Sequence, residues 1–189
     1  SQIAPPDEHT VYEEDRFSRI NYLAKLGYKV TDKWTLDFFG NYDKVSSDYD
    51  ASFDNTGAND TNLNSTESEQ FRFGFLPKYK YSKGEFVLNS SFNKIVRTYN
   101  DFDFYSNKPG FSEYESRSVN VDGFNKYEFS ESFFLVAGAQ YQFHDMNSIT
   151  PFGGILKEAT KFNMIDPYIT GVLSTDFGLN LNAGARLNI

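Results

Sequence analysis

The last stretch of the chain, Phe177–Ile189, alternates between apolar and polar side chains over thirteen residues. Its apolar positions are Phe177, Leu179, Leu181, Ala183, Ala185, Leu187 and Ile189, and its other positions are Gly178, Asn180, Asn182, Gly184, Arg186 and Asn188. Because successive side chains of a β-strand point to opposite faces, this period of two predicts a strand with one apolar and one polar face. At about 3.3 Å per residue and a tilt near 40°, such a strand rises roughly 33 Å, which is enough to cross the ~25 Å apolar band of an outer membrane. The pattern therefore predicts a transmembrane β-strand.

The same alternation recurs upstream in segments of similar length. These segments are Ile20–Val30, Trp34–Asp43, Phe71–Tyr81, Phe86–Asn93, Val119–Phe129, Phe133–His144 and Ile165–Leu173. In the last of them the face is ambiguous, because Tyr168 and Val172 compete with Ile169 and Leu173 for the apolar side. Pro77 interrupts another segment and predicts a local weakness in pairing, since proline has no N–H to donate.

The connections between these segments are alternately short and long. Short polar breaks lie near residues 32, 83, 131 and 175, whereas residues 44–70, 99–117 and 145–163 lose the alternation and are expected to be solvated loops. Aromatic residues flank each short break, as expected for a ring of aromatics at one membrane boundary. We therefore predict an all-β fold, an antiparallel transmembrane β-barrel segment of about eight strands in four hairpins.

Composition narrows the possible classes of protein. The 18% aromatic content suits strands and membrane interfaces, and no apolar run is long enough for a membrane-spanning helix. The net charge of −8 argues against a nucleic-acid partner, and the absence of cysteine excludes disulfides and thiolate metal sites. The chain starts at Ser1 without an initiator methionine, and residues 1–15 resemble the end of a loop, so we expect a piece of a longer protein.

Three segments support a resemblance to a known family. They are LGYKVTDKWTLDFFGNYDKVSSDYD (Leu26–Asp50), FGFLPKYKYSKGEFVLNSSFNK (Phe73–Lys94) and DPYITGVLSTDFGLNLNAGARLNI (Asp166–Ile189). Their order resembles the middle of the barrel of TonB-dependent outer-membrane receptors, most closely the vitamin B12 (cobalamin) receptor branch. These motifs are strand patterns and contain no signature of chemistry.

The resemblance implies a fold and a function for the chain. Such receptors have about 22 strands around a plugged lumen, so residues 1–189 would be a partial outer-membrane β-barrel domain without the plug domain and the remaining strands. The chain would supply wall and external loops to a receptor that imports a large scarce nutrient, such as cobalamin or an iron chelate (a siderophore complex). Its partners would be outer-membrane lipid, the nutrient, and the plug domain and TonB system through the missing parts. No enzymatic activity is expected, and the location would be the bacterial outer membrane.

The acidic segment after Tyr42 is the candidate metal site. Asp43, Asp48, Asp50 and Asp54 offer hard oxygen ligands that could converge on Ca²⁺. In the receptors that the chain resembles, external loops in this part of the barrel bind calcium. The spacing does not match an EF-hand, and a plain solvated acidic loop is the alternative.

Charged residues on the polar faces are expected to line a watery interior and to pair across strands. They are Lys25, Lys29, Asp37, Arg72, Lys78, Lys80, Asp122, Lys126, Glu128 and Arg186.

Three alternatives to the receptor remain open. A complete eight-stranded barrel acting as an anchor or adhesin would require the strand near Asn21 to pair with the strand near Asn182. A protease at the barrel rim would use His144 and Asp145 to activate water. A soluble β-sandwich would bury Leu179, Leu181 and Leu187 in a dry core.

Overall fold

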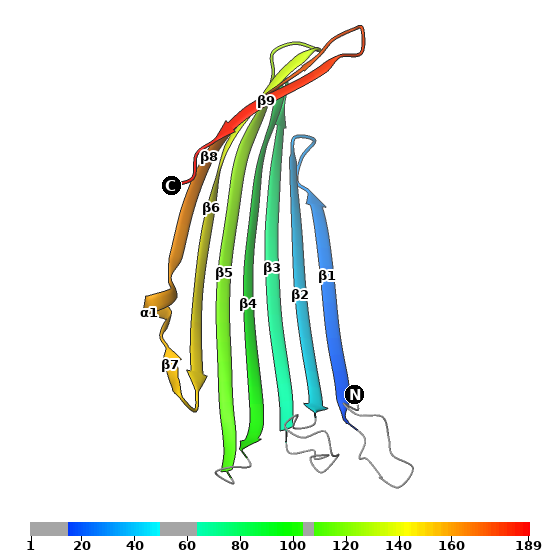
Figure 1. Cartoon of the computed structure of the whole chain (residues 1–189). Helices are drawn as coiled ribbons and strands as arrows, with labels where there is room; N and C mark the ends of the chain where they lie inside the picture. Colours follow the sequence, from blue (N-terminus) through cyan, green and yellow to red (C-terminus); the bar gives the residue numbers. More distant parts are fainter. Residues whose placement is uncertain (1–14, 50–63, 104–107) are drawn as a thin grey trace.

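The computed structural model describes residues 15–49, 64–103 and 108–189. In this part of the chain nine strands form one antiparallel sheet, and eight of them follow one another in chain order (Figure 1). The long strands are β1 (Phe17–Lys29), β2 (Trp34–Tyr49), β3 (Asn64–Tyr81), β4 (Gly84–Asp103), β5 (Lys108–Glu128), β6 (Phe133–Thr150), β8 (Phe162–Ser174) and β9 (Asn180–Arg186). The short β7 (Gly153–Ile155) pairs with the end of β6, and the one-turn helix α1 (Lys157–Thr160) precedes β8. The predicted all-β antiparallel architecture is confirmed.

In the part of the chain that the structure describes, the sheet has two free edges. β1 pairs with β2 and β9 pairs with β8, and these two outer strands lie at opposite ends of the curved sheet (Figure 1). No closure between β1 and β9 exists among the described residues, so the pairing required for a complete eight-stranded barrel is not observed.

The sheet is a single layer without a hydrophobic core. Among the described residues, Val87 is the one buried hydrophobic side chain. Leu179, Leu181 and Leu187 are 45%, 51% and 60% exposed, so they are not enclosed in the dry core that a sandwich would build. No second sheet covers either face in the described part of the chain.

The strands run well past their predicted ends. Residues 44–70 and 99–117 were expected to be loops, but β2 continues to Tyr49, β3 begins at Asn64, and β4 and β5 extend to Asp103 and from Lys108. β6 likewise continues to Thr150 inside the third expected loop. The loop prediction was wrong for these strand residues, because a strand with polar groups on both faces shows no alternation although its backbone ladder continues. For residues 50–63 and 104–107, which lie outside the described residues, it stays a prediction.

The last strand is shorter than predicted. β9 covers 7 residues, Asn180–Arg186, although Leu187 and Ile189 still form backbone hydrogen bonds with Pro167 and Ile165 on β8. At the other end, Phe177–Leu179 belong to a turn in which Gly178 has a positive φ of 89° and the Gly178 amide donates to the Thr175 carbonyl at 3.0 Å. Glycine adopts this left-handed conformation without the steric cost that a Cβ would bring.

Pro77 has the predicted local effect. The β3–β4 register runs without a shift from Ser65↔Asn100 to Tyr81↔Gly84, but the pairs opposite Leu76 and Pro77 are missing from the ladder. The proline remains paired on its other side, with Leu36 of β2. The sheet therefore accommodates the missing N–H with a local gap and without a change of register.

Candidate membrane interface

One face of the sheet is apolar across all eight long strands. Because directly paired residues share a face, the register places the predicted apolar sets of the separate strands side by side. We call this surface the apolar band; across the sheet it includes Leu26, Phe38, Phe75, Leu88, Val121, Leu135, Ile169 and Leu181. On β8 the ambiguity is resolved, since Ile169 and Leu173 pair with the apolar side and Tyr168 lies on the other face. On strands such as β3 and β6 the band covers about 9–11 residues, the length that a tilted transmembrane strand needs.

A continuous row of aromatic rings borders the band at the end with the short turns. Trp34 and Tyr79 have ring centroids 4.8 Å apart, and the contacts continue from Tyr79 to Tyr81 at 6.3 Å and from Tyr81 to Tyr127 at 6.5 Å. Phe129 and Phe133 extend the row. The ring centroids of Tyr127 and Phe129 are 4.8 Å apart, and those of Phe129 and Phe133 are 5.4 Å apart. The row therefore crosses from β2 to the β5–β6 turn, next to the turns at the upper end in Figure 1.

Ion pairs border the band at its other end, on the same face. This charged belt consists of Lys44, Glu67, Glu69, Lys94, Glu115, Arg117, Asp145 and Lys157. Lys44 lies 2.8 Å from Glu67 and 2.9 Å from Glu69, and Lys94 lies 2.9 Å from Glu115, which also pairs with Lys157 of α1. Along the strands, the side chains on this face change from apolar to charged within one or two cross-strand residue pairs. Because burying charged groups in hydrocarbon is costly, hydrocarbon could cover this face only up to the belt.

Arg117 and Asp145 form the most buried pair of the belt. The guanidinium donates to both carboxylate oxygens of Asp145, at 3.0 Å from Nε and through a shorter contact from Nη2. Asp145 is only 2% exposed. The Arg117 hydrogen bonds outweigh the effect of burial and hold the pKa of the Asp145 carboxyl below its usual range.

The opposite face, called the polar face below, carries the charged side chains as predicted, although apolar residues such as Leu23 and Phe39 lie on it too. The register places the predicted inward set on this side, including Lys25, Asp37 and Arg72. Arg186 of β9 pairs across strands as expected, 2.7 Å from Asp166 of β8, whereas Lys126 pairs at 2.8 Å with Glu128 of its own strand, β5. Asp122 instead accepts a hydrogen bond of 2.9 Å from the Tyr168 hydroxyl.

A buried carboxylate on β8 belongs to this polar network. Asp166 is 2% exposed, and its Oδ2 accepts hydrogen bonds from Nε and Nη2 of Arg186, at 3.2 and 2.7 Å. The same guanidinium contacts Gln140 of β6, so three strands are linked on the polar face. Asp166 Oδ1 has no hydrogen-bond partner within the described part of the chain.

The predicted calcium ligands do not come together where they are described. Asp43 lies on the polar face, where Arg19 donates to it at 2.9 Å and Asn21 at 2.7 Å. Asp48 lies on the opposite face, 3.6 Å from Arg16. No cluster of metal-binding side chains forms among the residues that the structure describes. Asp50 and Asp54 fall outside the described residues, and the calcium site stays a prediction.

His144 and Asp145 do not form a catalytic pair. They are consecutive residues of β6 and therefore point to opposite faces, with His144 on the polar side. Asp145 is held by Arg117, and the His144 ring lies 6.1 Å from the ring of Phe162. The arrangement required for the rim protease, a histidine oriented by the neighbouring aspartate, is absent at this position.

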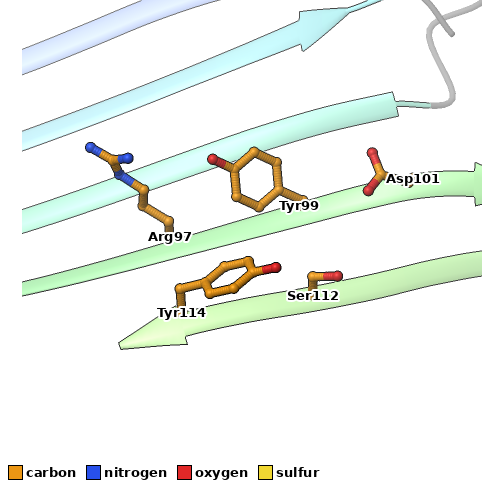
Figure 2. A pocket seen from close by; sticks show the side chains of 5 residues that line it. All are labelled: Arg97, Tyr99, Asp101, Ser112 and Tyr114. Carbon is orange, nitrogen blue, oxygen red and sulfur yellow. The ribbon is translucent and has the colours of Figure 1, made fainter. Parts of the chain in front are cut away.

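A hollow on the polar face escaped the sequence analysis. It is lined by Arg97, Tyr99 and Asp101 of β4 and by Ser112 and Tyr114 of β5, and it has a volume of about 520 Å³ (Figure 2). All five residues lie in the stretch expected to be a loop or directly before it. The available signal was the alternation of Arg97, Tyr99 and Asp101, which places them on one face once this segment is treated as a strand.

Comparisons with known proteins add no identification. No family model matches the chain, and neither a curated protein nor a solved structure is significantly similar to it. Among the described residues, no helix has the length and apolar character needed to cross a membrane.

Proposed function

We propose that this chain forms part of the wall of a β-barrel receptor in a bacterial outer membrane, of the TonB-dependent class that the sequence resembles. The observation that supports this proposal is the apolar band, a surface of exposed and partly exposed hydrophobic side chains that crosses eight strands, with no core behind it among the described residues. In water such a surface would be a severe aggregation liability, whereas in lipid it needs no protein partner.

The borders of the band fit the two boundaries of a membrane. Tyrosine and tryptophan prefer the headgroup level, which suits the row from Trp34 to Phe133. The charged belt at the other end suits the level at which water and headgroups replace hydrocarbon. Beyond the belt the paired strands continue, so that β4 and β5 would project into the external medium as a long hairpin.

The free edges favour a segment of a wider barrel over a complete small one. Among the described residues, β1 and β9 each pair with a strand on one side only, and each unsatisfied N–H or C=O in hydrocarbon costs several kcal/mol. Further strands on both sides would satisfy these edges and complete a barrel wide enough to enclose a plug.

The proposed role is uptake of a large, scarce nutrient such as cobalamin or an iron chelate. External loops and the ends of the projecting strands would bind the nutrient, and a plug domain energised through TonB would release it inward. In this segment we assign no residue to covalent chemistry, since the wall acts by supporting the binding surface.

Uptake by living cells tests this role. Cells that contain or lack the intact protein would be given labelled cobalamin and labelled ferric chelates, with and without a functional TonB system. We expect uptake of one of these nutrients that requires both the protein and TonB and that stops when the inner membrane is de-energised. Uptake that continues without TonB, or no difference when the protein is removed, would contradict the proposal.

A further inference from the structure

The hollow between β4 and β5 brings one cation and two aromatic rings together on the polar face. Arg97 pairs directly with Tyr114 across the two strands, and Tyr99 pairs with Ser112, so their side chains lie next to each other on one surface. The rings of Tyr99 and Tyr114 meet edge to face, with centroids 6.0 Å apart and planes at 83°. In Figure 2 the Tyr99 hydroxyl lies toward Arg97, and the Tyr114 hydroxyl lies toward Ser112.

The guanidinium of Arg97 is available for a ligand. It is exposed, and it has no ion pair or hydrogen bond within the part of the chain that the structure describes. This contrasts with Arg19, Arg117 and Arg186, which each hold a carboxylate. A planar guanidinium offers two parallel N–H donors, which fit the two oxygens of a carboxylate.

The other end of the hollow carries a negative charge. Asp101 lies four residues from Arg97 along β4, or about 13 Å at the usual strand rise. Its carboxylate accepts a hydrogen bond from the Tyr49 hydroxyl, and burial together with this bond raises the pKa of Tyr49. Asp101 therefore repels a second negative charge, so a matching ligand has its charge at the Arg97 end alone.

We propose that this hollow binds an organic monoanion in which a carboxylate adjoins an aromatic ring. The carboxylate pairs with Arg97, and the ring packs against Tyr99 and Tyr114, an arrangement in which aromatic contacts add to charge pairing. The volume of about 520 Å³ lies within the range of roughly 300–1,000 Å³ typical of small-molecule sites. The inference rests on the proposed function in one respect, namely that the polar face is open to water and solutes.

Calorimetry of benzoate binding to the intact protein in detergent micelles tests the proposal. Benzamide keeps the ring and lacks the charge, cyclohexanecarboxylate keeps the charge and lacks the aromatic ring, and phthalate adds a second carboxylate. We expect saturable binding at one site, with benzoate bound more tightly than all three analogues.

Variants locate the site. Arg97→Gln should weaken benzoate binding about tenfold or more, the loss expected for a charge-assisted hydrogen bond. Arg72→Gln is the matched control, because Arg72 is also exposed on the polar face but lies outside the hollow, and it should leave binding unchanged. Tyr114→Leu should weaken benzoate binding and leave cyclohexanecarboxylate binding almost unaffected.

Three results would overturn the inference: no saturable binding by the folded protein, equal affinities for benzoate and benzamide, or equal effects of Arg97→Gln and Arg72→Gln. None of them bears on membrane insertion or on TonB-dependent uptake, which are measured separately. Failure here is therefore distinguishable from failure of the proposed receptor function.

Discussion

Ile169→Arg is the substitution that separates a lipid-facing band from a surface exposed to water. Ile169 lies near the middle of the band on β8, is 46% exposed, and has the small residues Ala137 and Ala185 as its direct cross-strand neighbours. An arginine therefore has room at this position, so the effect of the substitution comes from the surrounding medium and hardly from packing.

The expected magnitude follows from the depth of the site. An arginine on the lipid face at the bilayer midplane costs about 2–4 kcal/mol, which corresponds to roughly a 30- to 900-fold change in the folding equilibrium. On a surface in contact with water the same exchange stays within about 0.5 kcal/mol. Asn182→Arg on β9 is the matched control, because Asn182 is exposed on the polar face and the substitution introduces the same side chain there.

The free energy of unfolding is measured by urea titration of the protein folded into lipid vesicles. Trp34 is the single tryptophan of the chain and lies in the aromatic row, so its fluorescence reports membrane insertion directly. We expect a loss of about 2–4 kcal/mol for Ile169→Arg and a change within about 0.5 kcal/mol for Asn182→Arg. Equal effects of the two substitutions would refute the assignment of the two faces.

Further predictions concern the belt and the turns. Asp145→Asn should lower the free energy of unfolding by about 1–3 kcal/mol near neutral pH, because it leaves Arg117 without its charged partner. Since the Arg117 hydrogen bonds hold the pKa of Asp145 in the folded protein below its ordinary value of 3.8, this stabilisation is present above that pH and is lost as the pH falls through the folded pKa. Denaturation curves should therefore show that the free energy of unfolding of the wild type falls as the pH is lowered, and that this fall is smaller in Asp145→Asn. The same pH dependence in the wild type and the variant would argue against the Arg117–Asp145 pair. Gly84→Ala should destabilise the β3–β4 hairpin by more than about 1 kcal/mol, since a Cβ there would lie 1.9 Å from the Lys126 carbonyl oxygen. Gly40→Ala serves as its control, with nothing within 4 Å of the added methyl group, and equal urea midpoints for the two variants would contradict the described packing at Gly84.

The part of the sheet that carries the apolar band was predictable from sequence, because strands with one apolar and one charged face show a period of two. That pattern placed Leu26, Phe75 and Leu181 on one face, and the register confirms it. Even the Pro77 gap was foreseeable, since the missing N–H is a local property of the residue.

The part of the sheet at and beyond the charged belt was not predictable in the same way. There, strands such as β4 and β5 have polar groups on both faces, so the sequence shows no hydrophobic alternation. Neighbouring strands are linked instead by ion pairs, such as that of Lys94 with Glu115. The loop prediction followed from the loss of alternation, and the calcium prediction followed from the loop. Once β2 extends to Tyr49, Asp43 and Asp48 are five positions apart on one strand and must face opposite sides.

The hollow was missed for a related reason. Its two tyrosines are distant in sequence and meet only through the register of β4 against β5, which no local pattern reveals. Arg97 becomes a candidate binding residue because it lies beside the two tyrosines and, unlike Arg19, Arg117 and Arg186, has no carboxylate partner among the described residues.

The most direct test of the central claim uses single cysteines along β8, which is possible because the chain has none of its own. A polarity-sensitive fluorophore would be attached in turn at Ile165, Met164, Ile169, Thr170 and Leu173 of the protein in vesicles that contain brominated lipid. We expect strong quenching at Ile165, Ile169 and Leu173 and weak quenching at Met164 and Thr170. Uniform quenching along the strand, or quenching at the even positions alone, would contradict the claim that the apolar band contacts hydrocarbon.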